Sequence, residues 1–156
     1  MIRIIKNSDI PKVLDLWLKA SIQAHSFVSS EYWQQMQSSV KENYLPYAHT
    51  FVFEDKHQIK GFISILDDRH IGALFVSPKF QGKKIGQKLL KTAQRRYPLL
   101  SLNVFTKNQR ALEFYQKNGF KIISEQQEPS TKETELYMCW GMGCKSGFCK
   151  RYQGDS

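Results

Sequence analysis

A basic turn that carries two glycines lies in the middle of the chain, at Gln81-Gly82-Lys83-Lys84-Ile85-Gly86-Gln87. An apolar run ending in Leu74-Phe75-Val76 precedes it, and a segment with the period of an amphipathic helix follows it. The N-terminus of a helix presents unpaired backbone N–H groups and a partial positive charge, which together suit a diphosphate. Glycine keeps side chains away from the backbone, and lysines add charge around it. The turn therefore predicts a site for a phosphorylated ligand.

The distribution of charge along the chain agrees with this prediction. The 156 residues have a formal net charge of +9. Residues 79–121 hold eleven Lys or Arg against one acid, Glu113, so essentially the whole excess lies in this stretch. A phosphorylated cofactor and a nucleic acid both fit such a cluster. A solvated, lysine-rich helix face gives the same pattern, so charge alone does not decide between them.

The elements that must position this turn follow from the hydrophobic pattern. The pattern predicts strands at Arg3–Ile5, Thr50–Phe53, Ile59–Leu66, Ile71–Val76, Leu99–Phe105, Phe120–Ser124 and Thr134–Trp140. It predicts helices that begin near Ile10, Ser30, Ile85 and Asn108, the second running to about Tyr44. This order indicates a mixed α+β domain with an antiparallel meander and one βαβ crossover. We expect a single domain over residues 1–140 and a flexible tail over 141–156.

Composition limits the class of protein. A chain of this length that is 41% hydrophobic can bury one substantial core. The sequence has no apolar run long enough for a membrane span and no signal segment, so we expect a cytoplasmic protein. The cysteines Cys139, Cys144 and Cys149 have C-x4-C-x4-C spacing without histidine, which favours free thiols over a zinc site. We expect no metal.

Two motifs resemble those of the GNAT superfamily of N-acetyltransferases. The family's phosphate-binding motif reads (Gln/Arg)-x-x-Gly-x-(Gly/Ala); Gln81 and Gly86 match its ends, and Lys84 stands where the family usually has glycine. The run from Thr106 to Phe120 is similar to the family signature Asn-x-x-Ala-x-x-Phe-Tyr followed by Gly-Phe. The resemblance covers about residues 2–140. It is strongest to small bacterial GNAT proteins of unassigned or protein-lysine specificity, which share Trp17-Leu18 and His25-Ser26-Phe27.

The resemblance implies a GNAT fold, with a central, mostly antiparallel, twisted sheet flanked by helices. It also implies direct transfer of acetyl from acetyl-CoA to a primary amine: a protein lysine, an N-terminus or a small molecule. The implied cofactor contacts are Leu74, Phe75, Val76, Gln81, Gly82, Lys83, Lys84, Ile85, Gly86, Gln87, Asn108 and Ala111. The implied general acid is Tyr115, because a phenol and a thiol have similar pKa values of about 9 to 10. By periodicity alone, Tyr115 is a core aromatic residue.

The acceptor side is less sharply defined. An attacking ammonium must first lose a proton, and His70 is the candidate base, with the acids Glu31, Asp67 and Asp68 as alternatives. By the family's layout, the segment between the first two helices lines the acceptor pocket. The substrate-binding candidates are therefore His25, Phe27, Glu31, Tyr32, Trp33 and Asp67. Amphipathic packing explains the aromatic residues equally well.

Two other functions fit parts of the sequence. A nucleic-acid-binding module would use the basic residues 79–121, but we find no helix-turn-helix signature and no RNP-type aromatic motif, so we disfavour it. A GNAT protein that binds CoA with weak activity stays open because of Lys84. The sequence is compatible with a monomer or a homodimer.

Overall fold

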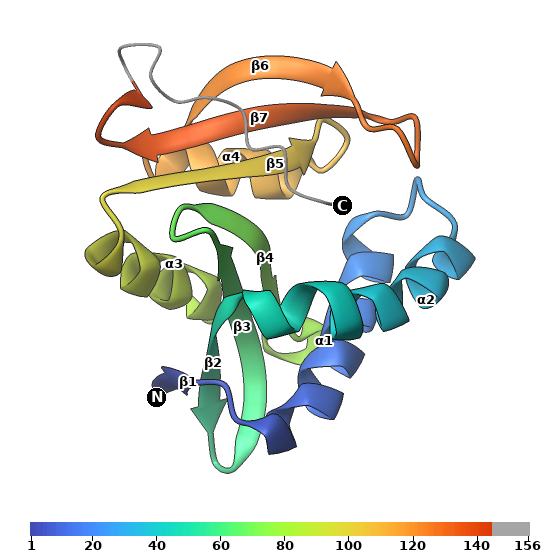
Figure 1. The fold of residues 1–156 in the computed structure, drawn as a ribbon, viewed down its shortest axis with the longest axis vertical. Helices are drawn as coiled ribbons and strands as arrows, with labels where there is room; N and C mark the ends of the chain where they lie inside the picture. The colour runs from blue at the N-terminus through green and yellow to red at the C-terminus, as the bar shows by residue number, and fades with distance from the viewer. Residues whose placement is uncertain (145–156) are drawn as a thin grey trace. The chain divides into compact units, whose positions relative to one another are not determined.

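The computed structural model describes residues 1–144 of the 156. Most of the predicted tail (residues 141–156), including Cys149, lies outside the described residues. The chain forms two compact units, residues 1–96 and the part from Tyr97 onward, which are described separately (Figure 1).

The first unit contains a four-stranded antiparallel sheet in the order β1-β2-β3-β4. Its strands are β1 (Ile2–Ile4), β2 (His49–Asp55), β3 (Gln58–Leu66) and β4 (His70–Val76). A two-residue turn joins β2 to β3; Lys56 and His57 both have positive φ there (51° and 62°), as a type I′ hairpin requires. In the register, Phe62 of β3 faces Phe75 of β4 and Gly61 faces Val76. The meander predicted from the sequence is confirmed within this unit.

Helices cover both faces of this sheet. They are α1 (Ile10–Ala24), preceded by the short turn η1 (Asn7–Asp9), and α3 (Ile85–Arg96), preceded by η4 (Pro78–Phe80). A Cβ at Gly61 would meet side chains of α3, whereas Phe75, the cross-strand partner of Phe62, contacts His25 at the end of α1. Because consecutive strand residues point to opposite faces, α1 and α3 lie on opposite sides of the sheet. Phe62 and Ile63 are accordingly both buried.

The second helical segment changes type along its length. The α-helix α2 (Ser30–Ser39) gives way to a π-helical turn, η2 (Val40–Tyr44), and then to a 3₁₀ turn, η3 (Leu45–Tyr47). The amide of Leu45 donates to the carbonyl of Val40, five residues earlier, which is the bond that defines the π turn. The π turn ends at the predicted position, Tyr44, and the 3₁₀ turn carries the helical segment three residues further, to Tyr47.

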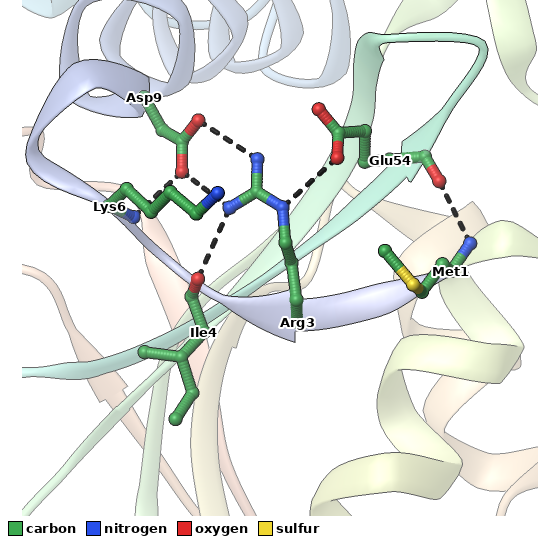
Figure 2. A network of polar contacts seen from close by, with 6 residues as sticks. All are labelled: Met1, Arg3, Ile4, Lys6, Asp9 and Glu54. Atoms are coloured by element: carbon green, nitrogen blue, oxygen red, sulfur yellow. Dashed lines mark hydrogen bonds and ion pairs between the residues drawn. The ribbon is translucent and has the colours of Figure 1, made fainter.

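A cluster of ionic contacts fixes the N-terminus (Figure 2). The guanidinium of Arg3 makes two bonds to the Asp9 carboxylate, at 2.7 and 3.0 Å, and its Nε donates to Glu54 at 3.1 Å. Asp9 is buried, and the hydrogen bonds from Arg3 hold the pKa of its carboxyl below the usual value. Arg3 thus connects β1 to the start of α1 and to β2, in the bidentate geometry that makes such pairs strong.

The second unit has a three-stranded antiparallel sheet in the order β5-β7-β6, with α4 alongside β5 (Figure 1). Its elements are β5 (Leu99–Phe105), α4 (Gln109–Lys117), β6 (Lys121–Gln127) and β7 (Thr134–Gly141). Tyr137 and Met138 of the central strand are fully buried. Strand β6 extends three residues beyond the prediction, because Gln126 donates to Glu135 of β7 at 3.0 Å and so continues the pairing through polar residues.

The free-thiol prediction is wrong for two of the three cysteines. Cys139 of β7 and Cys144 form a disulfide, with Cα atoms 5.8 Å apart. Gly141 and Gly143 both have positive φ (102° and 90°), and this turn brings Cys144 back to the strand. The C-x4-C-x4-C spacing alone does not indicate this turn.

Candidate active site

The turn that follows β4 is held in place by neighbouring backbone and side chains. The amide of Ser77 donates to the carbonyl of Lys60 on β3 at 2.8 Å. The side-chain amide of Gln81 donates to the carbonyl of Val76 at 3.3 Å and to the side chain of Gln23 on α1 at 3.0 Å. Gln81 therefore links the turn to the end of β4 and to α1.

Two residues of the turn adopt the left-handed backbone region. Gly82 has φ of 84° and Lys84 has φ of 63°. Nothing lies within 4 Å of the position that a Cβ on Gly82 would take. Glycine is therefore favoured here by the positive φ and not by a lack of space. Lys84 replaces the family's usual glycine, and it adopts a backbone conformation that glycine enters without steric cost.

The start of α3 presents a row of open amides. The first helical hydrogen bond found here runs from the amide of Lys88 to the carbonyl of Lys84, at 3.1 Å. Within residues 1–144, the amides of residues 82–87 donate no backbone hydrogen bond. Lys79, Lys83 and Lys84 are exposed around them. The side chain of Ile85 is buried and anchors the helix, so only its backbone can meet a ligand.

The end of β4 connects this turn to an aromatic cluster. Leu74, Phe75 and Val76 are partly buried. The ring of Phe75 meets His25 edge-on, with centroids 6.5 Å apart. The His25 ring also lies 5.0 Å from Trp33 and 5.8 Å from Phe27, while Tyr32 lies 4.9 Å from Trp33. Four of the predicted acceptor-side residues are therefore brought together against the predicted cofactor strand. Burial lowers the pKa of His25 to about 4, so its imidazole is neutral at physiological pH.

The other residues predicted on the acceptor side are His70, Asp67 and Glu31. His70 is buried at the start of β4, at the opposite end of the strand from Val76. Burial, with a smaller contribution from Arg69, lowers its pKa to about 4. Asp67 is exposed in the preceding turn with φ of 52°, and Glu31 is exposed in the first turn of α2.

The remaining candidates lie in the second unit. Asn108 is the N-cap of α4, and its Oδ1 accepts a hydrogen bond from the amide of Ala111 at 3.3 Å. Tyr115, near the end of α4, is buried between Phe114 and Phe120, whose ring centroids are 5.3 and 5.4 Å away. Burial raises the pKa of the Tyr115 phenol, which therefore keeps its proton at neutral pH.

Two residues that contact the turn or β4 were not predicted, Gln23 and Tyr44. Gln23 holds Gln81, as described above. Tyr44, in the π turn, lies directly over Gly72 of β4, where a Cβ would collide with its ring. The isolated glycine within an apolar strand was the available signal, since such a glycine often marks the close approach of another group.

Comparison with known proteins decides the family. The profile of the acetyltransferase (GNAT) domain matches residues 19–131. The chain belongs to the GNAT acetyltransferase family. It is an N-acetyltransferase, which moves an acetyl group to an amine. The expected fold and activity class are thereby confirmed.

Relatives of this GNAT protein include two enzymes of Escherichia coli (strain K12). Peptidyl-lysine N-acetyltransferase YiaC is 36% identical over 90% of this chain and 96% of its own length. Peptidyl-lysine N-acetyltransferase YjaB is 31% identical over 78% of this chain and 82% of its own.

Solved structures agree in fold. The solution structure of apo-form YjaB from Escherichia coli has a TM-score of 0.77 and 27% identity, over 90% of this chain and 96% of that one. A crystal structure of PaiA N-acetyltransferase from Thermoplasma acidophilum in complex with coenzyme A has a TM-score of 0.74 and 19% identity, over 90% and 98%.

Neither a membrane-spanning helix nor a cluster of metal ligands occurs in the described part of this GNAT chain. Every helix within residues 1–144 is too short or too polar to cross a membrane. The same residues hold no group of three or more His, Cys, Asp or Glu side chains arranged for a metal ion.

Proposed function

We propose that the protein transfers acetyl from acetyl-CoA directly to the side-chain amine of a peptidyl lysine. The observation that carries this proposal is the row of open amides at residues 82–87, with exposed lysines beside it. Such a row fits the diphosphate of acetyl-CoA. The acceptor class is supported by YiaC and YjaB, both named as peptidyl-lysine N-acetyltransferases.

The proposed reaction is a single displacement at the thioester. Gln81 to Gln87 bind the diphosphate, and the strand end Leu74–Val76 lies along the pantetheine. A backbone N–H of this strand end polarises the thioester oxygen and stabilises the charge that develops on it. The neutral lysine nitrogen attacks the thioester carbon, so that a C–N bond forms while the C–S bond breaks and sulfur leaves as a thiolate. The nitrogen then gives its remaining excess proton to water, and Tyr115 regains from water the proton that it gives to sulfur.

Tyr115 is the proposed general acid, which gives its phenolic proton to the departing thiolate. Its raised pKa keeps it protonated until that step. Burial also raises the pKa of a thiol placed beside it, because both anions lose solvation. The proton transfer therefore stays close to balanced, as efficient acid catalysis requires.

His70 is the proposed base, acting through water. The acceptor ammonium, with a pKa of about 10.4, must lose a proton before it attacks. His70 is neutral and can accept that proton, although its pKa of about 4 allows it to hold the proton only transiently. Asn108 and Ala111 complete the proposed cofactor contacts from α4.

Isothermal titration with CoA tests the cofactor half of the proposal. Lys83→Glu reverses a charge beside the open amides, and we expect about tenfold or greater loss of affinity, since charges a few ångströms apart interact by at least about 1 kcal/mol. Lys12→Glu, which reverses an exposed charge on α1, is the matched control and should bind CoA like the parent protein. Mass spectrometry of lysyl peptides incubated with acetyl-CoA tests the acceptor half. Absence of binding heat together with absence of acetylated peptide would contradict the proposal.

A further inference from the structure

Two buried polar atoms at the contact between α1 and α2 have no hydrogen-bond partner among the described residues. They are the hydroxyl of Ser21 and the indole Nε1 of Trp33. The exposed fraction of Ser21 is 1% and that of Trp33 is 9%. Buried donors and acceptors in proteins are almost always paired, because an unpaired one keeps its full desolvation penalty. Two of them in the same place call for a common explanation.

Both atoms belong to one helix contact. Trp17, Ser21 and His25 follow one another at four-residue spacing on and just after α1, so their side chains share one face. The Trp33 ring of α2 contacts Trp17 at 6.0 Å and His25 at 5.0 Å between centroids. The indole therefore spans the face on which Ser21 lies between those two residues.

The hydrogen-bonding capacity of Ser21 Oγ and Trp33 Nε1 indicates which group could bind both. An indole N–H can only donate, whereas a serine hydroxyl can donate or accept. A carbonyl oxygen has two lone pairs and can accept from both groups at once. An ammonium group has only donors, so it cannot bind the Trp33 N–H. The pair therefore matches a carbonyl oxygen of an acceptor rather than its amine.

The pair lies next to the reacting end of the proposed site. Phe75 of β4 contacts His25, and His25 in turn contacts Trp33. A carbonyl bound by Trp33 would thus lie one aromatic ring away from the strand that the proposed function assigns to the thioester.

The tie between α1 and α2 lies away from Trp33. The side chain of Gln37 donates to the carbonyl of Leu14 at 3.1 Å, which ties α1 to α2 near the C-terminal end of α2. Trp33 lies in the N-terminal half of α2. Binding of a carbonyl would therefore require the N-terminal half of α2 to move away from α1, a movement that leaves the bond at Gln37 in place.

We infer that Ser21 Oγ and Trp33 Nε1 bind a backbone carbonyl oxygen of a peptidyl acceptor, and thereby favour peptides over polyamines. This inference rests on the proposed function. It identifies Ser21 and Trp33 as specificity-determining residues, and it distinguishes two acceptors that carry the same reacting group: a lysyl peptide has a carbonyl at each residue, and a polyamine has none.

Steady-state kinetics with two acceptors test the inference. Trp33→Phe removes the N–H and keeps a ring, and Ser21→Ala removes the hydroxyl. For a lysyl peptide, each substitution should raise KM about tenfold, the effect of losing about 1.4 kcal/mol, with kcat little changed. For spermidine, KM should stay unchanged in both variants. Gln34→Ala, which removes an exposed amide from α2, is the matched control and should alter neither KM.

The outcomes separate this inference from the function on which it rests. If the parent protein acetylates no peptide, both are overturned. If the parent protein acetylates the peptide but the variants keep its KM, or lose affinity for peptide and spermidine alike, the subsite alone is overturned. Urea unfolding supplies a second readout: a Ser21→Ala variant that is less stable and kinetically normal assigns the pair to a buried water and also overturns the subsite.

Discussion

The imidazole of His25 stands edge-on to the ring of Phe75, with centroids 6.5 Å apart and ring planes at 81°. This contact joins the C-cap residue of α1 to the C-terminal end of strand β4. Phe75 is backed by Phe62, whose ring centroid is 6.1 Å away. A single aromatic contact thus connects the proposed acceptor side of the protein to the proposed cofactor strand.

The two buried histidines should make the protein sensitive to mild acid. Their pKa values are lowered to about 4, mainly by burial, whereas an unfolded histidine titrates at about 6.5. Between these values the unfolded chain binds more protons than the folded one, so the free energy of unfolding falls as pH falls. We expect a slope of about 1 kcal/mol per pH unit for each histidine between roughly pH 6 and pH 5.

Urea unfolding at several pH values measures this slope. His70→Gln should flatten it by about half, since one of two such groups is removed. His57→Asn is the control, because His57 is exposed in the β2–β3 turn and asparagine tolerates its positive φ. A slope unaffected by His70→Gln would mean that His70 is protonated as readily in the folded chain as in the unfolded one.

Removal of the Tyr115 hydroxyl should affect turnover and not binding. For Tyr115→Phe we expect unchanged CoA affinity and about a hundredfold lower kcat, the usual scale for a lost general acid. Tyr47→Phe removes the hydroxyl of an exposed tyrosine and should be kinetically normal. Single-turnover acetylation together with CoA titration makes the distinction. Equal kcat in the two variants would leave Tyr115 as a core residue of the second unit.

Substitutions at Lys84 should reveal the cost of its backbone conformation. A residue with a Cβ loses roughly 1 kcal/mol in the left-handed region, where Lys84 lies with φ of 63°. Lys84→Gly and Lys84→Ala both remove the charge, but only glycine relieves this cost. Relief of this cost favours the glycine variant by about 1 kcal/mol over the alanine variant. The greater conformational freedom of glycine in the unfolded chain offsets part of this gain, so the glycine variant should be more stable by less than about 1 kcal/mol. Urea unfolding of the pair provides the measurement; a more stable alanine variant would contradict the left-handed conformation.

The disulfide between Cys139 and Cys144 should be detectable directly. Both cysteines fall in one tryptic peptide, Glu133 to Lys145, which should be lighter by two hydrogen atoms before reduction than after it. Closing so short a loop is worth about 2 kcal/mol, so reduction should lower the free energy of unfolding by about that amount. Cys144→Ser should lose both effects and Cys149→Ser should keep them. A peptide of full dithiol mass would restore the free-thiol interpretation.

Much of the arrangement around the cofactor turn follows from local sequence. The apolar strand, the glycine turn and the amphipathic helix each have a short-range signal, and β4 and α3 lie within a residue of where the pattern predicts them. The conformation of Lys84 had no such signal, because lysine is not a residue associated with positive φ. Its place in the family motif was the only indication.

The acceptor side was predicted less completely, for a physical reason. Hydrophobic periodicity marks the apolar residues of a helix face, so it found Trp17 but not Ser21, a polar residue buried on the same face. The π turn at Val40–Tyr44 depends on a bond between residues five apart, which leaves no distinct pattern in a short segment. The disulfide was missed because Gly141, the last residue of β7, and Gly143 reverse the chain, and composition alone does not show that reversal.

Gly72 makes the position of Tyr44 unusually easy to manipulate. Because the phenol of Tyr44 fills the space where any larger residue would place its first carbon, Gly72→Ala would displace the Tyr44 side chain while the cofactor turn keeps its own contacts. One methyl group in β4 thus offers a means to move the Tyr44 side chain without altering any of the proposed catalytic groups.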